Sequence, residues 1–233
     1  MFSRRAFFIS SAAVSFATAS AATAQDACSV FTPDRQKATT PESALQLLKD
    51  GNARFAAGKT VNCDLLAQVR ATSNGQSPFA VVVGCIDSRV PPELVFDQRI
   101  GDVFVARVAG NFVNDDIIGS LEFATKLAGA KAIVVLGHTE CGAIKGAVDG
   151  AKLGLLTKML ENFNPALEAS RAVEGERSSK NKKLVQAVAD TNAVLAAKKL
   201  TDRSEILRDL VAQKQLVIAA AMHDIGTGSV KFL

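Results

Sequence analysis

Two apolar runs rich in β-branched residues place the strongest constraint on how this chain can fold. The first covers residues 78–84 and the second residues 130–137, and neither alternates regularly between apolar and polar side chains. Continuous runs of this kind are typical of parallel strands that helices bury on both faces. Further strands are expected over residues 102–108 and 215–222. The sequence therefore predicts an α/β fold with a mostly parallel central sheet flanked by helices.

Helices are expected between and after these strands. Thr39 and Glu42 have the spacing of a capping box, so a helix is expected to begin there and to end at Gly58. A second helix is expected over residues 115–128. The charged stretch over 153–213 is also expected to be helical, and its apolar positions at helical spacing are Leu184, Val188, Thr191 and Leu195.

The first 24 residues have the pattern of a signal peptide. A basic pair, Arg4 and Arg5, precedes an apolar run and a small-residue cleavage site, which would start the mature chain near Gln25. The arginine pair also resembles a twin-arginine export signal. The alternative is an uncleaved membrane anchor, but five Ser and Thr residues between positions 10 and 20 make the segment too polar for that. We therefore expect a periplasmic or otherwise exported protein with one domain over residues 25–233.

The remaining chain has a nearly balanced charge. Without Arg4 and Arg5 it carries 25 basic and 23 acidic residues, a net charge of +2, and it contains no Trp or Tyr. A nucleic-acid partner is not expected, because such proteins carry basic patches and, for single strands, aromatic stacking platforms. No other stretch is apolar enough to cross a bilayer, so no membrane contact is expected after signal cleavage.

Potential metal ligands directly follow the two strongest strand predictions. Cys85 follows the first run, His138 follows the second, and Cys141 lies three residues further on. Because ligands of open parallel sheets bind at the carboxyl ends of the strands, the three side chains are expected to share one rim. Thiolate and imidazole are ligands that Zn²⁺ prefers. The alternative is an inert buried cysteine beside a structural histidine.

Asp87 and Arg89 extend the first half of this candidate zinc site. Residues 85, 87 and 89 point the same way if the chain stays extended, and Arg89 can hold Asp87 in a bidentate pair. A closed structural zinc site uses four protein ligands, whereas a catalytic site uses three and a water molecule. The pair beside a three-ligand set therefore favours catalysis, with Asp87 as either a fourth ligand or a gate.

Two cysteines, Cys28 and Cys63, remain if Cys85 and Cys141 hold a metal. An exported protein folds in an oxidising compartment, so a Cys28–Cys63 disulfide is expected to tie the N-terminal arm to the segment after the first helix. Two separate thiols are the alternative.

Residues 78–93 and 137–143 resemble the two signature segments of β-class carbonic anhydrases. The resemblance runs from roughly Thr40 to the C-terminus, and shorter segments agree with the family in the same order, at 96–98, 101–111, 119–123 and 224–228. It implies one zinc ion per subunit on Cys85, His138 and Cys141. It also implies an obligate homodimer, often assembled further, with the active site near the interface.

The same resemblance implies a role for each remaining site residue. Asp87 and Arg89 would form a dyad that orients the reacting water or, when broken, lets Asp87 take the fourth ligand position. His223 departs from the family, because many members have tyrosine there, and this puts a bicarbonate regulatory pocket in question. As the only other histidine, His223 is the one spare imidazole for a proton relay, but the sequence favours a histidine that is satisfied by a local hydrogen bond at the strand end.

The activity that the resemblance implies is the reversible hydration of CO₂ to bicarbonate and a proton. Two alternatives stay open from the residues alone. One is a related zinc hydrolase acting on CS₂ or COS through the same site. The other is a non-catalytic zinc-binding partner protein in which the metal is permanently held by two cysteines, a histidine and an aspartate.

Overall fold

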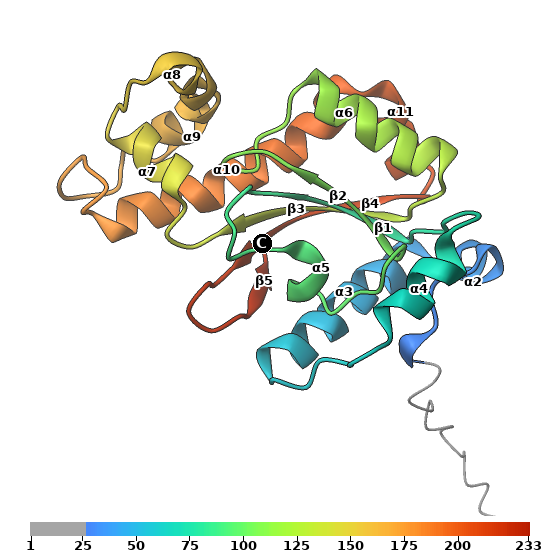
Figure 1. Cartoon of the computed structure of the whole chain (residues 1–233). Helices are drawn as coiled ribbons and strands as arrows, with labels where there is room; N and C mark the ends of the chain where they lie inside the picture. The colour runs from blue at the N-terminus through green and yellow to red at the C-terminus, as the bar shows by residue number, and fades with distance from the viewer. Residues whose placement is uncertain (1–26) are drawn as a thin grey trace, which may run out of the picture.

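The computed structural model describes residues 27–233, and the predicted signal peptide over residues 1–24 lies outside them. Its centre is a five-stranded sheet in the order β2-β1-β3-β4-β5 (Figure 1). The first four strands run parallel, and the short last strand runs antiparallel beside β4. The predicted α/β fold is therefore confirmed. The strands are β1 (Ala80–Gly84), β2 (Val103–Arg107), β3 (Ala132–His138), β4 (Val217–His223) and β5 (Val230–Phe232).

Helices cover both faces of the sheet, which explains why its central strands are apolar. Every residue of β1 and β3 is buried. Above the sheet in Figure 1 lie α6 (Asp115–Glu122), α10 (Lys182–Arg203) and α11 (Glu205–Ala212). Below it lie α2 (Pro33–Ala38), α3 (Pro41–Ala56), α4 (Leu65–Thr72) and α5 (Pro92–Val95). Three short helices lie at one end, namely α7 (Gly142–Val148), α8 (Gly154–Leu160) and α9 (Asn164–Ala169). No helix in the described part of the chain combines the length and apolarity needed to cross a bilayer.

The N-terminus of α3 differs from the prediction by one residue. Thr40 is the N-cap residue and accepts a hydrogen bond from the backbone amide of Ser43, whose side chain accepts from the amide of Thr40 in return. The predicted capping box between Thr39 and Glu42 is therefore wrong. Adjacent threonines offer two equivalent spacings, and serine closes the box here in place of the usual glutamate.

The predicted helix over residues 115–128 changes type part-way. It is α-helical from Asp115 to Glu122, and residues 123–127 then form one turn of π-helix. The side chains at the two ends of this turn are exposed, Phe123 by 53% and Leu127 by 77%. Helix propensity does not reveal such a turn, because a π-turn differs only in which carbonyl each amide reaches.

The longest helix, α10, has a buried stripe that is shifted from the predicted one. Leu184 and Val188 are buried as expected, but the stripe continues through Asn192 and not through Thr191. The residues before the helix, 170–181, contain no helix, so the prediction of helix over the whole charged stretch is wrong there. The shifted stripe puts a polar side chain at a buried position.

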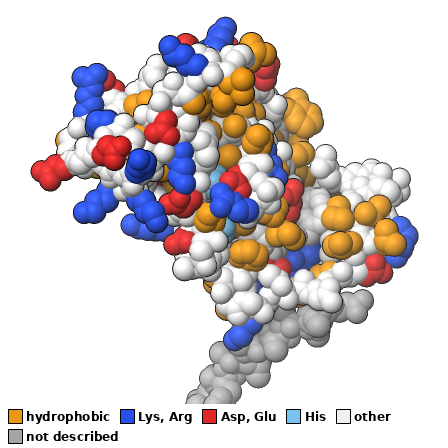
Figure 2. Space-filling model, turned by 60° about the vertical axis from the view of Figure 1, so that its left-hand side comes forward, with side chains coloured by type: hydrophobic (Ala, Val, Ile, Leu, Met, Phe, Trp, Pro, Cys, Tyr) orange, Lys and Arg blue, Asp and Glu red, His pale blue; other side chains and the backbone are white. Residues whose placement is uncertain are grey.

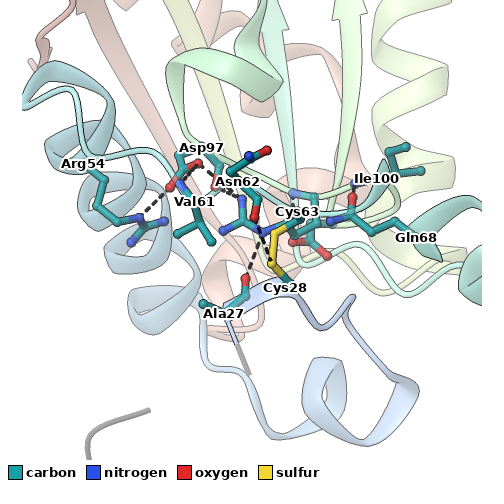
Figure 3. Close-up of a disulfide and its surroundings, with 11 residues drawn as sticks. Ala27, Cys28, Arg54, Val61, Asn62, Cys63, Gln68, Asp97 and Ile100 are labelled. Carbon is teal, nitrogen blue, oxygen red and sulfur yellow. Dashed lines mark hydrogen bonds and ion pairs between the residues drawn. A yellow bond between two sulfur atoms is a disulfide. The ribbon is translucent and has the colours of Figure 1, made fainter. Parts of the chain in front are cut away.

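A disulfide between Cys28 and Cys63 fastens the N-terminal arm to the lower layer, as predicted (Figure 3). Beside it, Arg99 Nε donates a hydrogen bond to the carbonyl oxygen of Ala27 over 2.9 Å. Arg99 is itself buried and is held by the Asp97 carboxylate over 3.3 Å. The arm is therefore attached both covalently and through a buried ion pair.

Replacing Cys28 and Cys63 with serine is expected to lower the melting temperature by about 10 °C. A disulfide that joins residues 35 positions apart contributes about 3–4 kcal/mol, and each kcal/mol corresponds to about 2–4 °C in a domain of this size. Calorimetry of the wild type with and without reductant, beside the double variant, measures the effect. Reductant should not change the double variant. Equal melting temperatures for the oxidised wild type and the double variant would contradict the prediction.

Candidate active site

The rim at the carboxyl ends of β1 and β3 gathers three buried side chains that carry metal-binding atoms. Cys85 directly follows β1, His138 is the last residue of β3, and Cys141 lies three residues further on. Parallel pairing of Gly84 with Leu136 brings the two strand ends together. The two sulfur atoms and one imidazole nitrogen all lie within 4.8 Å of one another. The predicted convergence of these residues on one rim is confirmed.

The donor atoms of this cluster fit a tetrahedral zinc site. The sulfurs of Cys85 and Cys141 are 4.0 Å apart, and two sulfurs bound tetrahedrally at about 2.3 Å from zinc would lie about 3.8 Å apart. His138 Nδ1 donates to the carbonyl oxygen of Thr139 over 2.9 Å, which leaves the lone pair on Nε2. Among the described residues this buried Nε2 has no hydrogen-bond partner. A buried acceptor without a partner, aimed at two thiols, is explained by a metal ion.

Backbone N–H groups surround both sulfurs. The amides of Gly110 and Asp87 lie 3.2 and 3.4 Å from Cys85 Sγ, and Cys141 is the N-cap residue of α7. The hydrogen bond from Cys141 lowers the pKa of the Cys85 thiol to about 4, against the opposing effect of burial. The same hydrogen bond, together with burial, raises the pKa of Cys141. Metal ions bind the deprotonated thiolate, so the groups that lower the pKa of Cys85 also favour metal binding.

Asp87 and Arg89 form the predicted bidentate pair at the edge of the cluster. Arg89 donates from Nε to Asp87 Oδ1 over 2.9 Å and from Nη2 to Oδ2 over 2.7 Å. These hydrogen bonds hold the pKa of the Asp87 carboxyl well below its usual range. Asp87 Oδ2 is 3.9 Å from His138 Nε2, so the carboxylate lies beside the three clustered ligands and not among them.

The loop that carries this pair is not extended, contrary to the expectation for residues 85–89. The strand ends at Gly84, and the chain then turns so that the Arg89 amide donates to Asp87 Oδ1 over 3.0 Å. On the face of the molecule shown in Figure 2, histidine atoms are recessed between acidic and basic side chains. The ligands are thus buried while Arg89, whose side chain is 53% exposed, faces solvent.

Comparison with known proteins agrees with this geometry. Residues 80–230 match the sequence model of the carbonic anhydrase family. The carbonic anhydrase of Mycolicibacterium smegmatis is 35% identical to this chain over 189 residues, which cover 78% of this chain and 89% of that protein. The solved β-carbonic anhydrase of Coccomyxa, in complex with acetazolamide, covers 81% of this chain and 84% of its own, with a TM-score of 0.65 and 25% identity. This chain belongs to the β-class carbonic anhydrase family.

Two further relatives extend this assignment. Carbonic anhydrase 2 of Mycobacterium tuberculosis is 34% identical over 196 residues, covering 82% of this chain and 91% of that protein. A solved β-carbonic anhydrase of the fungus Sordaria macrospora, from a report on two tetrameric enzymes, has a TM-score of 0.61 at 29% identity. It covers 72% of this chain and 91% of its own.

Three residues that contact the loop over residues 85–89, directly or through one another, were not assigned a role from the sequence. Arg107, at the end of β2, donates from Nε to the carbonyl oxygen of Cys85 over 2.7 Å and from Nη2 to that of Asp87 over 2.6 Å. Gly110 donates to the Cys85 sulfur, and Asn192 of α10 donates to the carbonyl oxygen of Gly110. Two features of the sequence could have indicated them. Arg107 is a single charged residue at the end of an apolar strand, and Asn192 is a polar residue on the buried side of a helix.

His223 lies beside the site on the neighbouring strand. It pairs in register with His138, and its ring centroid is 6.4 Å from that of Phe55. The side chain is buried, which lowers its pKa. Its Nδ1 has no hydrogen-bond partner among the described residues, so the local hydrogen bond expected at this strand end is missing at that atom. A role as proton relay stays a prediction.

Replacing Arg89 with glutamine is expected to destabilise the metal-free protein at pH 7 but not in strong acid. The folded-state pKa of Asp87 is depressed by Arg89, so this stabilisation is present above the ordinary aspartate pKa of about 3.9 and is lost as the pH falls further. The melting temperature is expected to fall by a few degrees at most at pH 7, because solvent screens an exposed ion pair, and this difference should shrink progressively below about pH 4.

Thermal unfolding of both proteins between pH 2 and pH 8 measures this difference. Arg171→Gln is the matched control, because it removes an exposed ion pair with Glu168, for which little effect is expected at any pH. A destabilisation by Arg89→Gln that stays constant across the whole pH range would exclude the Asp87 carboxylate as its source.

Proposed function

We propose that this chain uses a zinc ion held by Cys85, His138 and Cys141 to catalyse the reversible hydration of CO₂ to bicarbonate and a proton. The observation that carries the proposal is the buried three-ligand cluster with an ionised carboxylate beside it. Three protein ligands leave the fourth tetrahedral position for the reaction, as in catalytic zinc sites. Asp87 is kept out of that position by its two side-chain hydrogen bonds from Arg89.

Bound zinc would act as a Lewis acid that lowers the pKa of a water molecule to about 7. Asp87 orients the attacking oxygen. Its carboxylate is ionised at neutral pH and can accept a hydrogen bond from the attacking hydroxyl, which aims an oxygen lone pair at the carbon of CO₂. Arg89 holds the carboxylate in that direction, and Arg107 holds the loop on which both Cys85 and Asp87 lie. The proton that is released passes to solvent or buffer.

The two alternative functions fit the observations less well. A permanently four-coordinate zinc protein would need Asp87 as a ligand, but both carboxylate oxygens are engaged by Arg89. A hydrolase acting on CS₂ or COS would use the same ligands, so the site chemistry does not separate it from CO₂ hydration. The relatives that align over most of their length are carbonic anhydrases by name, which favours CO₂.

Stopped-flow CO₂ hydration by the zinc-loaded protein between pH 7 and 9 tests the proposal. Replacing Asp87 with alanine is expected to lower kcat by about 100-fold, the scale expected when a reacting group loses its orientation. The zinc content should not change, because Asp87 is outside the ligand cluster. Asp202→Ala, which breaks an exposed ion pair with Lys198, is the control and should keep full activity.

Different outcomes separate the three functions. A wild-type rate no faster than buffer would rule out carbonic anhydrase activity. Release of sulfide from COS without CO₂ hydration would support the hydrolase. Stable zinc binding with neither activity would support the non-catalytic protein. Full CO₂ hydration by the Asp87→Ala variant would leave the enzyme assignment intact but contradict the role given to Asp87.

The free edge of β2 supports a further proposal, that the chain forms a homodimer or a higher homo-oligomer. β2 is one of the two edge strands of the described sheet, and an unpaired strand edge is a template for association. The ring of Phe104 on β2 lies 6.2 Å from that of Phe123, which is exposed together with Leu127. The Sordaria macrospora enzymes are tetrameric. We propose that the β2 edge and the π-helix contribute to the interface.

Replacing Leu127 with glutamate is expected to lower the oligomer's molar mass in solution, because a buried carboxylate without a partner opposes association. Light scattering after size-exclusion chromatography measures the mass. Leu155→Glu on α8 is the control, since Leu155 is 87% exposed and lies in a different helix away from the β2 edge. A monomeric wild type, or an unchanged mass in the Leu127→Glu variant, would contradict the proposed interface.

Export is the remaining part of the proposal. We propose that residues 1–24 are a signal peptide, that the chain is an exported bacterial form, and that residues 25–233 make up its one domain. The Cys28–Cys63 disulfide supports export, because structural disulfides persist mainly in oxidising compartments. N-terminal sequencing of the protein purified from the periplasm of its host tests the cleavage near Gln25. A purified protein that still carries Arg4 and Arg5 would count against it.

A further inference from the structure

A chain of two hydrogen bonds links the middle of α10 to one of the candidate zinc ligands. Asn192 is 5% exposed, and its Nδ2 donates to the carbonyl oxygen of Gly110 over 2.8 Å. The backbone amide of Gly110 in turn donates to Cys85 Sγ over 3.2 Å. Asn192 is 107 positions from Cys85 in the sequence, and only the packing of α10 on the sheet brings them together.

Gly110, which links Asn192 to Cys85, lies in a turn that depends on glycine. The amide of Asn111 donates to the carbonyl oxygen of Val108 over 3.0 Å, and Gly110 has a φ of +76°, the value typical of the third position of a type II turn. A Cβ atom on Gly110 would lie 2.4 Å from the ring of Phe163. No side chain can therefore anchor this turn from Gly110 itself, and glycine has the widest conformational freedom of any residue.

Asn192 supplies the anchor that the turn lacks. By holding the carbonyl group of Gly110, the carboxamide fixes the orientation of the turn, and with it the direction of the Gly110 amide toward the sulfur. An N–H donor on a thiolate withdraws electron density from the sulfur, so the thiolate gives less charge to a bound metal. Groups that orient metal ligands typically change metal affinity or activity by about 10–100-fold when they are removed.

We propose that Asn192 is a positioning residue for the metal centre, acting through Gly110 on the Cys85 thiolate. This inference rests on the metal site of the proposed function but not on CO₂ as the substrate. A purely structural role, holding α10 against the loop after β2, predicts a different result. It would lower stability without altering the electronic properties of the bound metal.

Cobalt(II) substitution tests the proposal, because the thiolate-to-cobalt charge-transfer band reports the electron density on sulfur. In Asn192→Ala the band is expected to move to longer wavelength, and the zinc dissociation constant is expected to rise by about 10–100-fold. Asn192 lines a cavity of about 160 Å³, so water can occupy the space that the side chain leaves. Asn192→Leu, which keeps a similar shape but cannot donate, should shift the band in the same direction.

Asn181→Ala is the matched control on the same helix. Asn181 is also an asparagine whose Nδ2 donates to backbone carbonyl oxygens, those of Glu174 and Glu176, but it caps the start of α10, and these hydrogen bonds reach neither the candidate ligands nor the Gly110 turn. Its variant is expected to lose thermal stability with no change in the cobalt band. A band that stays unmoved in both Asn192 variants, with stability reduced as in Asn181→Ala, would overturn the proposal in favour of a structural role.

A measurement on the wild type covers the case in which the Asn192 variants do not fold. In the protein loaded with ¹¹³Cd, the amide proton of Gly110 is expected to show scalar coupling to the metal across its hydrogen bond to sulfur. Absence of that coupling, or failure of the wild type to bind cobalt or cadmium through thiolates, would also overturn the proposal. Failure of CO₂ hydration alone would not, since these readouts need the metal centre but no substrate.

Discussion

The parallel pairing of β1 with β3 is the interaction on which the candidate site depends. Gly84 and Leu136 are register partners, so the chain leaves β1 at Cys85 close to the point where β3 delivers His138. A change of register by one residue would exchange the faces on which the side chains lie and would separate the ligands. Because both strands are buried on both faces, the close packing of their side chains against the covering helices holds that register. The metal-binding geometry is therefore a consequence of the apolar core beneath it.

Burial also creates the electrostatic problem that the surrounding residues solve. Two thiols, an imidazole and a carboxylate at the edge of an apolar core would be costly to ionise without compensation. The amides of Gly110 and Asp87 compensate Cys85, the start of α7 compensates Cys141, and Arg89 compensates Asp87. These partners come from three segments, namely the loop over residues 85–89, the turn at Gly110 and the start of α7. The site is thus held by elements that are separate in sequence and joined only by the sheet.

Much of this arrangement could be predicted from the sequence, for identifiable reasons. Cys85 and His138 follow continuous apolar runs, and strand direction alone brings such positions to one rim. The Asp87–Arg89 pair needs only local contact, so its bidentate form was predictable even though the loop turned out not to be extended. The pairing of Cys28 with Cys63 followed from the two cysteines left over and from the oxidising compartment expected for the chain.

The features that could not be predicted depend on tertiary contacts. The buried stripe of α10 was predicted from the spacing of its apolar residues, so Asn192 was not included. Its burial is explained by its hydrogen bond to the carbonyl group of Gly110, 82 positions away. Arg107 ends a strand like many surface residues, and only its contact with the Cys85 loop distinguishes it. Two further features differ from the prediction by one residue. After Glu122 each amide reaches a carbonyl one residue further back, which makes a π-helix, and Thr40 caps α3 in place of Thr39. Local propensities do not resolve such differences.

The charges at the rim suit the proposed reaction for a reason that goes beyond the ligand set. A divalent metal ion with two thiolates and a neutral imidazole has no net charge, and the Asp87–Arg89 pair adds none. A site that is neutral overall and lies at the end of apolar strands does not repel a neutral, apolar molecule such as CO₂, and it offers no strong attraction to the bicarbonate anion. Arg89 is half exposed on the solvent side of the pair, so its favourable interaction with an anion is screened by water. Release of bicarbonate is therefore not opposed by a buried cation. Whether CO₂ is hydrated or bicarbonate is dehydrated then depends on the concentrations of substrate and product.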